Sequence, residues 1–143
     1  MDLRELTAPC GLDCFNCIVY LANDNEEFRK QVASAGIPYE EATCAGCRKE
    51  KGCHHLHALG ILPESESHCK VFQCVSSKGF ETCADCSEFP CDNLQPFADK
   101  AAFLPHNMKV FNLALIKKMG VEKWAQEKAK LVRDRYFCEK FNI

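Results

Sequence analysis

Three Cys-x-x-Cys pairs carry the clearest chemistry in this sequence. They are Cys14/Cys17, Cys44/Cys47 and Cys83/Cys86. Two intervening residues let the chain turn tightly and direct both sulfurs at one ion, which is the zinc-knuckle spacing. Two such pairs complete a tetrahedral four-thiolate site. Three pairs in 143 residues therefore predict bound metal.

Other cysteines accompany these pairs and enlarge the set of candidate ligands. The full set is Cys10, Cys14, Cys17, Cys44, Cys47, Cys69, Cys74, Cys83, Cys86 and Cys91. In one partition, one ion is held by Cys44, Cys47, Cys69 and Cys74. A second ion is held by Cys14, Cys17, Cys83 and Cys86, and either Cys10 or Cys91 could replace one of these ligands. Spacing alone leaves the partition open, but ten thiolates are enough for two or more zinc ions.

Several further residues have the right chemistry without the paired spacing. Cys53 follows Cys47 by six residues, and it is either a ligand or a small buried side chain. His54, His55, His57 and His68 offer imidazole nitrogens, which suit zinc, so whether they are ligands also stays open. Cys138 stands alone among aromatic residues, and we expect it to pack rather than bind metal.

A structural role for the metal is favoured over catalysis. The His-Glu-x-x-His signature of zinc proteases and the His-x-Glu and Pro-Cys-x-x-Cys signature of zinc deaminases are both absent. Cys10, Cys14 and Cys17 have a spacing that can hold three irons of a [4Fe–4S] cluster, so an iron–sulfur redox protein is the alternative. A zinc-dependent enzyme comes third.

Composition narrows the cellular setting and the partners. The chain begins without a basic and apolar leader, so we expect a cytoplasmic protein with reduced thiols rather than a disulfide scaffold. A net charge of −2, with dispersed Lys and Arg, disfavours nucleic acid. No apolar run is long enough to span a membrane. The partner we expect for a structural zinc module of this kind is another protein.

The elements that must position these ligands are mainly α-helical, with irregular metal-stabilised loops and little β-structure. We predict one domain over residues 1–143, with a metal-binding half at 7–92 and a helical half at 93–143. A helix capped by Asp24, with Glu27 completing a capping box, should end at Gly36, and a shorter one should run from Cys14 to Leu21. Residues 40–92 show no sustained period.

The helical half shows a clearer pattern. Met108, Phe111, Leu115 and Met119 share one stripe, which is widened by Val110, Leu113 and Ala114. The stripe predicts a helix that packs it into the core and ends at Gly120. A second amphipathic helix is predicted from Val121 to Val132, and a short one after Cys91 that includes Leu94 and Phe97.

The combination of motifs resembles a prokaryotic family of cysteine-rich proteins catalogued as a domain of unknown function, DUF3795. The resemblance covers about residues 7–97. It rests on the segments Ala8-Pro9-Cys10-Gly11-Leu12-Asp13-Cys14 with Cys17, Cys44-Ala45-Gly46-Cys47-Arg48, Cys69 with Cys74, and Cys83 with Cys86 and Glu88-Phe89-Pro90-Cys91. It implies zinc binding at the ten cysteines and supplies no activity. The stretch from Cys53 to His68 is longer and richer in histidine than the family's usual linker, and the family's C-terminal cysteine pair is incomplete here.

Overall fold

The computed structural model describes residues 1–63 and 69–142, and across them the chain is mainly helical with no β-strand, as predicted. The α-helices are α1 (Ile18–Leu21), α2 (Glu26–Ser34), α3 (His55–Ala58), α4 (Lys70–Lys78), α5 (Lys109–Met119), α6 (Val121–Glu127) and α7 (Ala129–Cys138). Short 3₁₀ turns lie at Cys14–Asn16, Tyr39–Glu41, Cys83–Asp85, Asp92–Leu94 and Pro105–Met108. A single antiparallel bridge joins Thr7 and Asp13.

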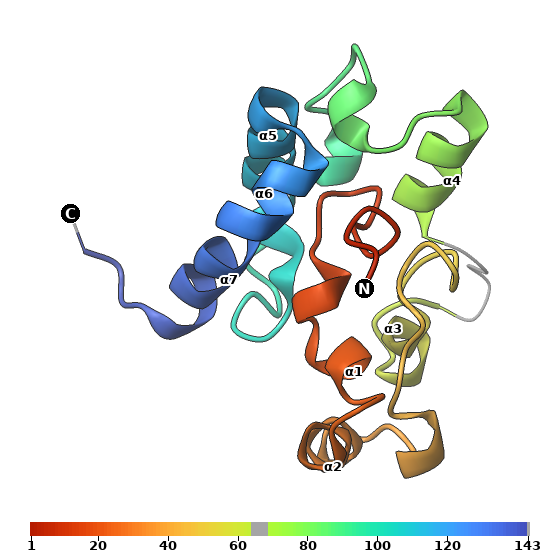
Figure 1. Cartoon of the computed structure of the whole chain (residues 1–143). Coiled ribbons are helices and arrows are strands. Elements are labelled where there is room, and N and C mark those ends of the chain that lie inside the picture. Colours follow the sequence, from red (N-terminus) through yellow and green to blue (C-terminus); the bar gives the residue numbers. More distant parts are fainter. Residues whose placement is uncertain (64–68, 143) are drawn as a thin grey trace.

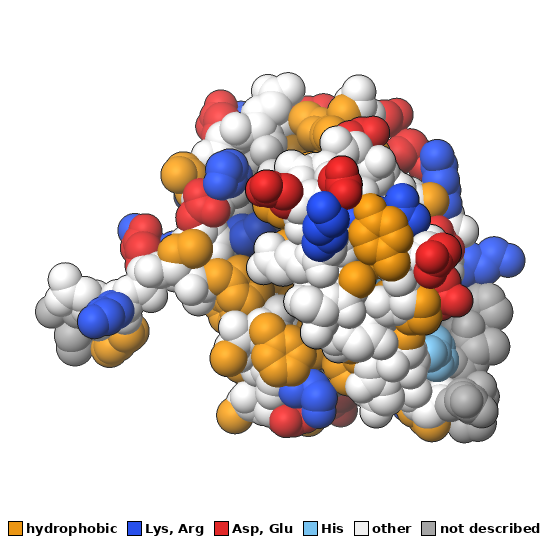
Figure 2. Space-filling model, turned by 90° about the horizontal axis from the view of Figure 1, so that it is seen from below, with side chains coloured by type: hydrophobic (Ala, Val, Ile, Leu, Met, Phe, Trp, Pro, Cys, Tyr) orange, Lys and Arg blue, Asp and Glu red, His pale blue; other side chains and the backbone are white. Residues whose placement is uncertain are grey.

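The elements surround the N-terminal segment (Figure 1). Helices α5, α6 and α7 pack together on one side of it, and α4 lies on the other. Helices α1, α2 and α3 gather at the lower end, away from α5. The last residues leave α7 as an extended tail that points away from the body (Figures 1 and 2). None of the helices in the described residues is long and apolar enough to cross a membrane.

Helix α2 begins one residue later than the sequence pattern predicted. The N-cap is Asn25, whose side-chain oxygen accepts hydrogen bonds from the backbone N–H groups of Glu27 at 3.0 Å and Phe28 at 3.1 Å. Asp24 and Asn25 are both good capping residues, so spacing could not separate them. The predicted end is close, because Gly36 follows the helix with a positive φ of 101°.

The stretch from residue 40 to 92 contains more helix than predicted. Helix α4 buries Val71 and Val75, one turn apart, and ends at Gly79 in the left-handed conformation. Two buried positions in a nine-residue helix are too few to produce a visible period. The predicted helix from Cys14 to Leu21 is instead interrupted at Cys17, whose backbone is extended between a 3₁₀ turn and α1.

The stripe predicted to pack the helical half is confirmed in part: Met108 and Leu113 are buried, and Leu115 and Met119 pack against the large core. Helix α5 buries Asn112, Leu113 and Ile116, whereas Phe111 is 58 % exposed. The reason is a polar contact that hydrophobic periodicity cannot detect. Asn112 donates to the carbonyl of Gly11 at 2.9 Å, and its oxygen accepts from the indole N–H of Trp124 at 3.4 Å.

The predicted helix from Val121 to Val132 is two helices. The chain breaks at Lys128, whose φ of −125° and ψ of −37° end α6 and allow α7 to start in a new direction. The short helix predicted after Cys91 is the 3₁₀ turn Asp92–Leu94, which buries Leu94 and leaves Phe97 exposed.

One large apolar core joins the cysteine-rich and helical parts of the chain. Its buried members are Leu6, Ala8, Cys10, Cys14, Phe15, Val71, Val75, Ala84, Leu94, Leu113, Ile116, Val121, Trp124, Ala125 and Ala129. A small separate cluster consists of Val32, Ile37 and Ala42, with Leu59 at the end of α3 packed against it. The large core therefore holds the loops around Cys10 and Cys14 against α5 and α6.

Two contacts fix the N-terminal cysteine loop, which runs from Cys10 to Cys14, against the helical part. A Cβ at Gly11 would lie 2.7 Å from the Leu113 side chain, and the φ of Gly11 is +82°, so only glycine fits. Next along the chain, the buried carboxylate of Asp13 accepts two hydrogen bonds from the guanidinium of Arg133 on α7, at 2.9 and 2.5 Å.

Candidate metal centre

All twelve cysteines are free thiols, and most of the predicted ligands fall into two groups in space. The first thiol group consists of Cys14, Cys17, Cys44, Cys47 and Cys53, which act on one another electrostatically. The second thiol group consists of Cys74, Cys83, Cys86 and Cys91, which line one hollow. Cys10 and Cys69 belong to neither group, and Cys138 is exposed at the end of α7.

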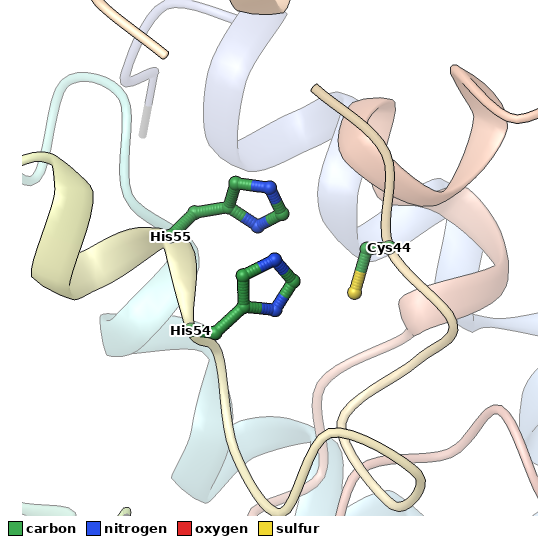
Figure 3. A group of neighbouring side chains, drawn as sticks. All are labelled: Cys44, His54 and His55. Atoms are coloured by element: carbon green, nitrogen blue, oxygen red, sulfur yellow. The ribbon is translucent and has the colours of Figure 1, made fainter. Parts of the chain in front are cut away.

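The tightest set of ligand atoms lies beside the first thiol group. One ligand atom each from Cys44, His54 and His55 lies within 4.8 Å of the other two. No other trio of Cys, His, Asp or Glu in the described residues meets that limit. Figure 3 shows both imidazole rings projecting from the start of α3 toward the facing loop that carries Cys44. These three residues form a possible metal-binding group that joins two loops.

The hydrogen bonds of His55 leave one ring nitrogen available for a metal. Its Nε2 lies 2.8 Å from the carbonyl oxygen of Glu41, which can only accept, so Nε2 carries the proton. Nδ1 is then a bare lone pair, and it is buried without a hydrogen-bond partner. Burial also lowers the pKa of His55, which favours this neutral form. A neutral imidazole oriented by a backbone carbonyl is the usual state of a metal ligand.

His54 completes the group from a more exposed position. Its ring contacts that of His55 at a tilt of 41°, with centroids 3.7 Å apart, and its Nδ1 lies 3.6 Å from a carboxylate oxygen of Glu50. A carboxylate beside a histidine ligand is a common way to fix the ring. His57 is half-buried outside this group, and His68 lies outside the described residues.

Cys14 and Cys47, from different Cys-x-x-Cys pairs, form a directly coupled thiol pair. A hydrogen bond with Cys47 lowers the pKa of Cys14 to about 7 and raises that of Cys47. Arg133 also lowers the pKa of Cys14. The first and second Cys-x-x-Cys pairs of the sequence therefore meet in space.

Burial dominates the remaining thiols of the first group. It raises the pKa of Cys17, that of Cys44 to about 11 and that of Cys53 to about 12. The neighbouring thiols raise the pKa values of Cys44 and Cys53 further, because anions would repel one another. The backbone N–H of Gly46 donates to the Cys44 sulfur at 3.3 Å, and this hydrogen bond lowers the pKa of Cys44. A dication bound among these sulfurs would lower the pKa values of the thiols and favour thiolates.

The second thiol group lines a hollow of about 270 Å³ between α4 and the segment from residue 80 to 94. Burial raises the pKa of Cys83 to about 12, and the other three thiols of the group contribute. The ammonium of Lys78 lies 3.7 Å from the sulfur of Cys86 and 2.5 Å from a carboxylate oxygen of Glu88. Cys91 is exposed at the edge of the hollow.

Cys10 is buried in the large core, and the partly buried Cys69 packs against the same core. Burial raises the pKa of Cys10 to about 11, and Cys69 contributes to this increase. A Cβ on Gly52 would lie 2.7 Å from the Cβ of Cys69, so the two backbones approach closely there. Neither residue lines the hollow of the second group.

The grouping differs from the partition considered for the sequence. Cys44 and Cys47 adjoin Cys14 and Cys17 rather than Cys69 and Cys74, and Cys83 and Cys86 adjoin Cys74 and Cys91. Whether each of the ten cysteines binds metal stays a prediction. The histidines at 54 and 55, left open by the sequence, are the ones that the structure groups with a thiol within 4.8 Å.

Arg48 is an organising residue that pattern analysis of the cysteines missed. Its guanidinium donates to the carbonyls of Thr7 and Glu81, each at 2.9 Å, and so links the loop after Cys47 to the segments that precede Cys10 and Cys83. Its position directly after a Cys-x-x-Cys pair was the only available signal.

Comparison with known proteins agrees with the cysteine pattern. The family described as "Protein of unknown function (DUF3795)" matches residues 6–96, which include all ten predicted ligands. No curated protein and no solved structure matches the chain.

Proposed function

The chain belongs to the DUF3795 family, and from that premise and the geometry above we propose that it is a structural zinc-binding protein. Cys44, His54 and His55 hold one ion, and the paired cysteines supply the remaining thiolate ligands for two or more ions per chain. The observation that carries the proposal is the buried Nδ1 of His55, which has no hydrogen-bond partner and lies beside Cys44 and His54.

A zinc ion would account for a polar arrangement that is otherwise costly. An unpaired buried polar atom costs about 1–3 kcal/mol, and such atoms in native proteins usually have a ligand or water as partner. Zinc takes four ligands in structural sites. Cys17 and Cys53, which are electrostatic neighbours of Cys44, are the thiols available to complete the shell.

The donor set favours zinc over an iron–sulfur cluster at this site. Iron–sulfur clusters are held chiefly by cysteine thiolates, whereas mixed cysteine and histidine shells are standard for structural zinc. The proposed role of the ion is to join the loop at Cys44 to the start of α3, so the metal replaces an apolar core there.

Metal analysis of the purified protein tests this proposal. We expect a colourless protein containing at least two zinc ions per chain when it is prepared under reducing conditions without oxygen. His55→Ala should release one ion, whereas His57→Ala, a neighbouring histidine outside the group, should retain all of them. A brown protein with stoichiometric iron would contradict the zinc proposal, as would His55→Ala with unchanged metal content.

A further inference from the structure

We propose that Cys74, Cys83, Cys86 and Cys91 bind one zinc ion as a four-thiolate site, separate from the ion at Cys44, His54 and His55. The four thiols line the same hollow, and none of them belongs to the first thiol group. This inference rests on the proposed function, because it takes zinc as the metal. It assigns a second ion to specific ligands.

The backbone that carries these four thiols is held in place without the metal. Cys74 lies on α4, which is anchored in the large core through Val71 and Val75. Cys83 starts a 3₁₀ turn with a capping box: the backbone N–H of Thr82 donates to Asp85 at 2.8 Å, and the N–H of Ala84 donates to the Thr82 hydroxyl at 3.2 Å. The N–H of Cys83 also donates to the carbonyl of Pro9 at 2.9 Å. The backbone around Cys74 and Cys83 is therefore held in place before an ion binds, whereas the sulfurs still have to converge.

The charges around the hollow suit a cation bound by thiolates. Glu88 and Asp92 line it and favour entry of a dication. Four thiolates around Zn²⁺ leave two negative charges, and the Lys78 ammonium beside Cys86 offsets part of that charge. Lys78 thus acts as a positioning residue outside the ligand shell, shared between Cys86 and Glu88.

The spacing of the sulfurs implies that this site closes when zinc binds. No three of the four sulfurs all lie within 4.8 Å of one another. A tetrahedral ion with Zn–S distances of about 2.3 Å requires sulfurs about 3.8 Å apart. Cys91 is the exposed ligand at the edge and can move inward, and because Cys74, Cys83 and Cys86 also exceed the 4.8 Å limit, their side chains must rotate toward the ion as well. We therefore expect this site to release zinc to a chelator faster than the more enclosed site at His55.

The first test counts the ions. Wild-type protein should contain two zinc ions per chain, and Cys83→Ser/Cys86→Ser should contain one. Cys138→Ser, which changes an exposed cysteine outside both groups, is the matched control and should retain two. Circular dichroism should show that the double variant keeps its helices, because serine is close to cysteine in size and the buried members of the large core are unchanged.

A second test uses a residue whose loss cannot disturb the core. Cys91→Ser should weaken zinc binding at one site at least about tenfold in competition with a chromophoric chelator, whereas Cys91→His should restore it, because imidazole is also a zinc ligand. Lys78→Met should weaken the same site about tenfold, as loss of a supporting residue does, without removing the ion at saturating zinc.

The outcomes separate this inference from the proposed function. If wild-type protein holds one ion, which His55→Ala removes and Cys83→Ser/Cys86→Ser does not, the second site and the count of two or more ions are wrong, and the zinc proposal stands for the site at His55 alone. Loss of both ions in Cys91→Ser would refute two separate sites. Wild-type protein that binds no zinc overturns both proposals.

Discussion

The region around α1, α2 and α3 and the body formed by α4 to α7 are held together by different means. In the described residues, the body and the N-terminal segment that it surrounds bury fifteen hydrophobic side chains in one core, whereas the α1–α3 region adds only Val32, Ile37 and Ala42 in a cluster of its own. Each buried aliphatic side chain contributes about 1.5–3 kcal/mol, so three cannot order that region. The candidate metal group lies on α3, where the apolar core is smallest.

This difference shows why ligands and apolar residues are distributed as they are. His55 starts α3, and Leu59 at the other end of α3 packs on the small cluster. An ion at Cys44, His54 and His55 would therefore fix the same helix that the small cluster contacts.

Removal of metal should unfold one region and leave the other folded. A structural zinc ion contributes about 10–16 kcal/mol of binding free energy in small zinc domains, which exceeds what the small cluster supplies. We expect strong chelation under reducing conditions to unfold residues 18–61 while α5, α6 and α7 remain folded. Hydrogen exchange measured by mass spectrometry, with and without chelator, checks this result. Unchanged exchange in residues 18–61 would show that the region does not depend on metal.

Leu113→Ala should destabilise the body instead. Leu113, on α5, is fully buried against the loop at Gly11. Truncation of such a leucine costs about 2–5 kcal/mol because it leaves a cavity. Urea unfolding of the zinc-loaded protein measures the loss. Leu131→Ala, at a leucine that is 63 % exposed, is the control and should change the free energy of unfolding by less than about 0.5 kcal/mol. Equal losses of unfolding free energy in Leu113→Ala and Leu131→Ala would show that Leu113 does not belong to the core.

Arg133→Met should break the contact between α7 and the N-terminal cysteine loop. It leaves the Asp13 carboxylate buried, with Asn16 as its remaining side-chain partner, at a cost of about 3 kcal/mol. Arg135→Met, which removes an exposed pair with Glu139, should cost less than about 0.5 kcal/mol. Both values come from urea unfolding. Adding Asp13→Asn to Arg133→Met should recover part of the loss, and failure to recover it would argue against a charge effect.

Asn25→Ala should have a small, local effect on α2. Removal of an N-cap costs about 1 kcal/mol, and here it would leave the amides of Glu27 and Phe28 without their acceptor. Amide exchange at these two residues should increase. Asp24→Ala is the control, because Asp24 precedes the cap and neither of these amides donates to it. A larger effect of Asp24→Ala would indicate that Asp24 is the N-cap of α2, as the sequence predicted.

Much of the fold could be predicted because local patterns reflect local physics. The helical class and the glycine after α2 followed from spacing and conformational preference. The burial of Asn112 and the exposure of Phe111 on α5 could not, because Asn112 is held by a hydrogen bond to Gly11, about a hundred residues away in the chain. The same limit hid α4, whose two buried valines meet residues from other segments.

The sequence by itself determined the donors and their local spacing, since two residues between cysteines constrain both sulfurs whatever surrounds them. Only the tertiary structure decided which donors meet. It joined Cys14 to Cys47, gathered Cys74 with Cys83, Cys86 and Cys91, and left the buried Nδ1 of His55 facing a thiol and a second imidazole. The physical reason is that a metal site requires proximity in space, and core packing and buried hydrogen bonds set that proximity.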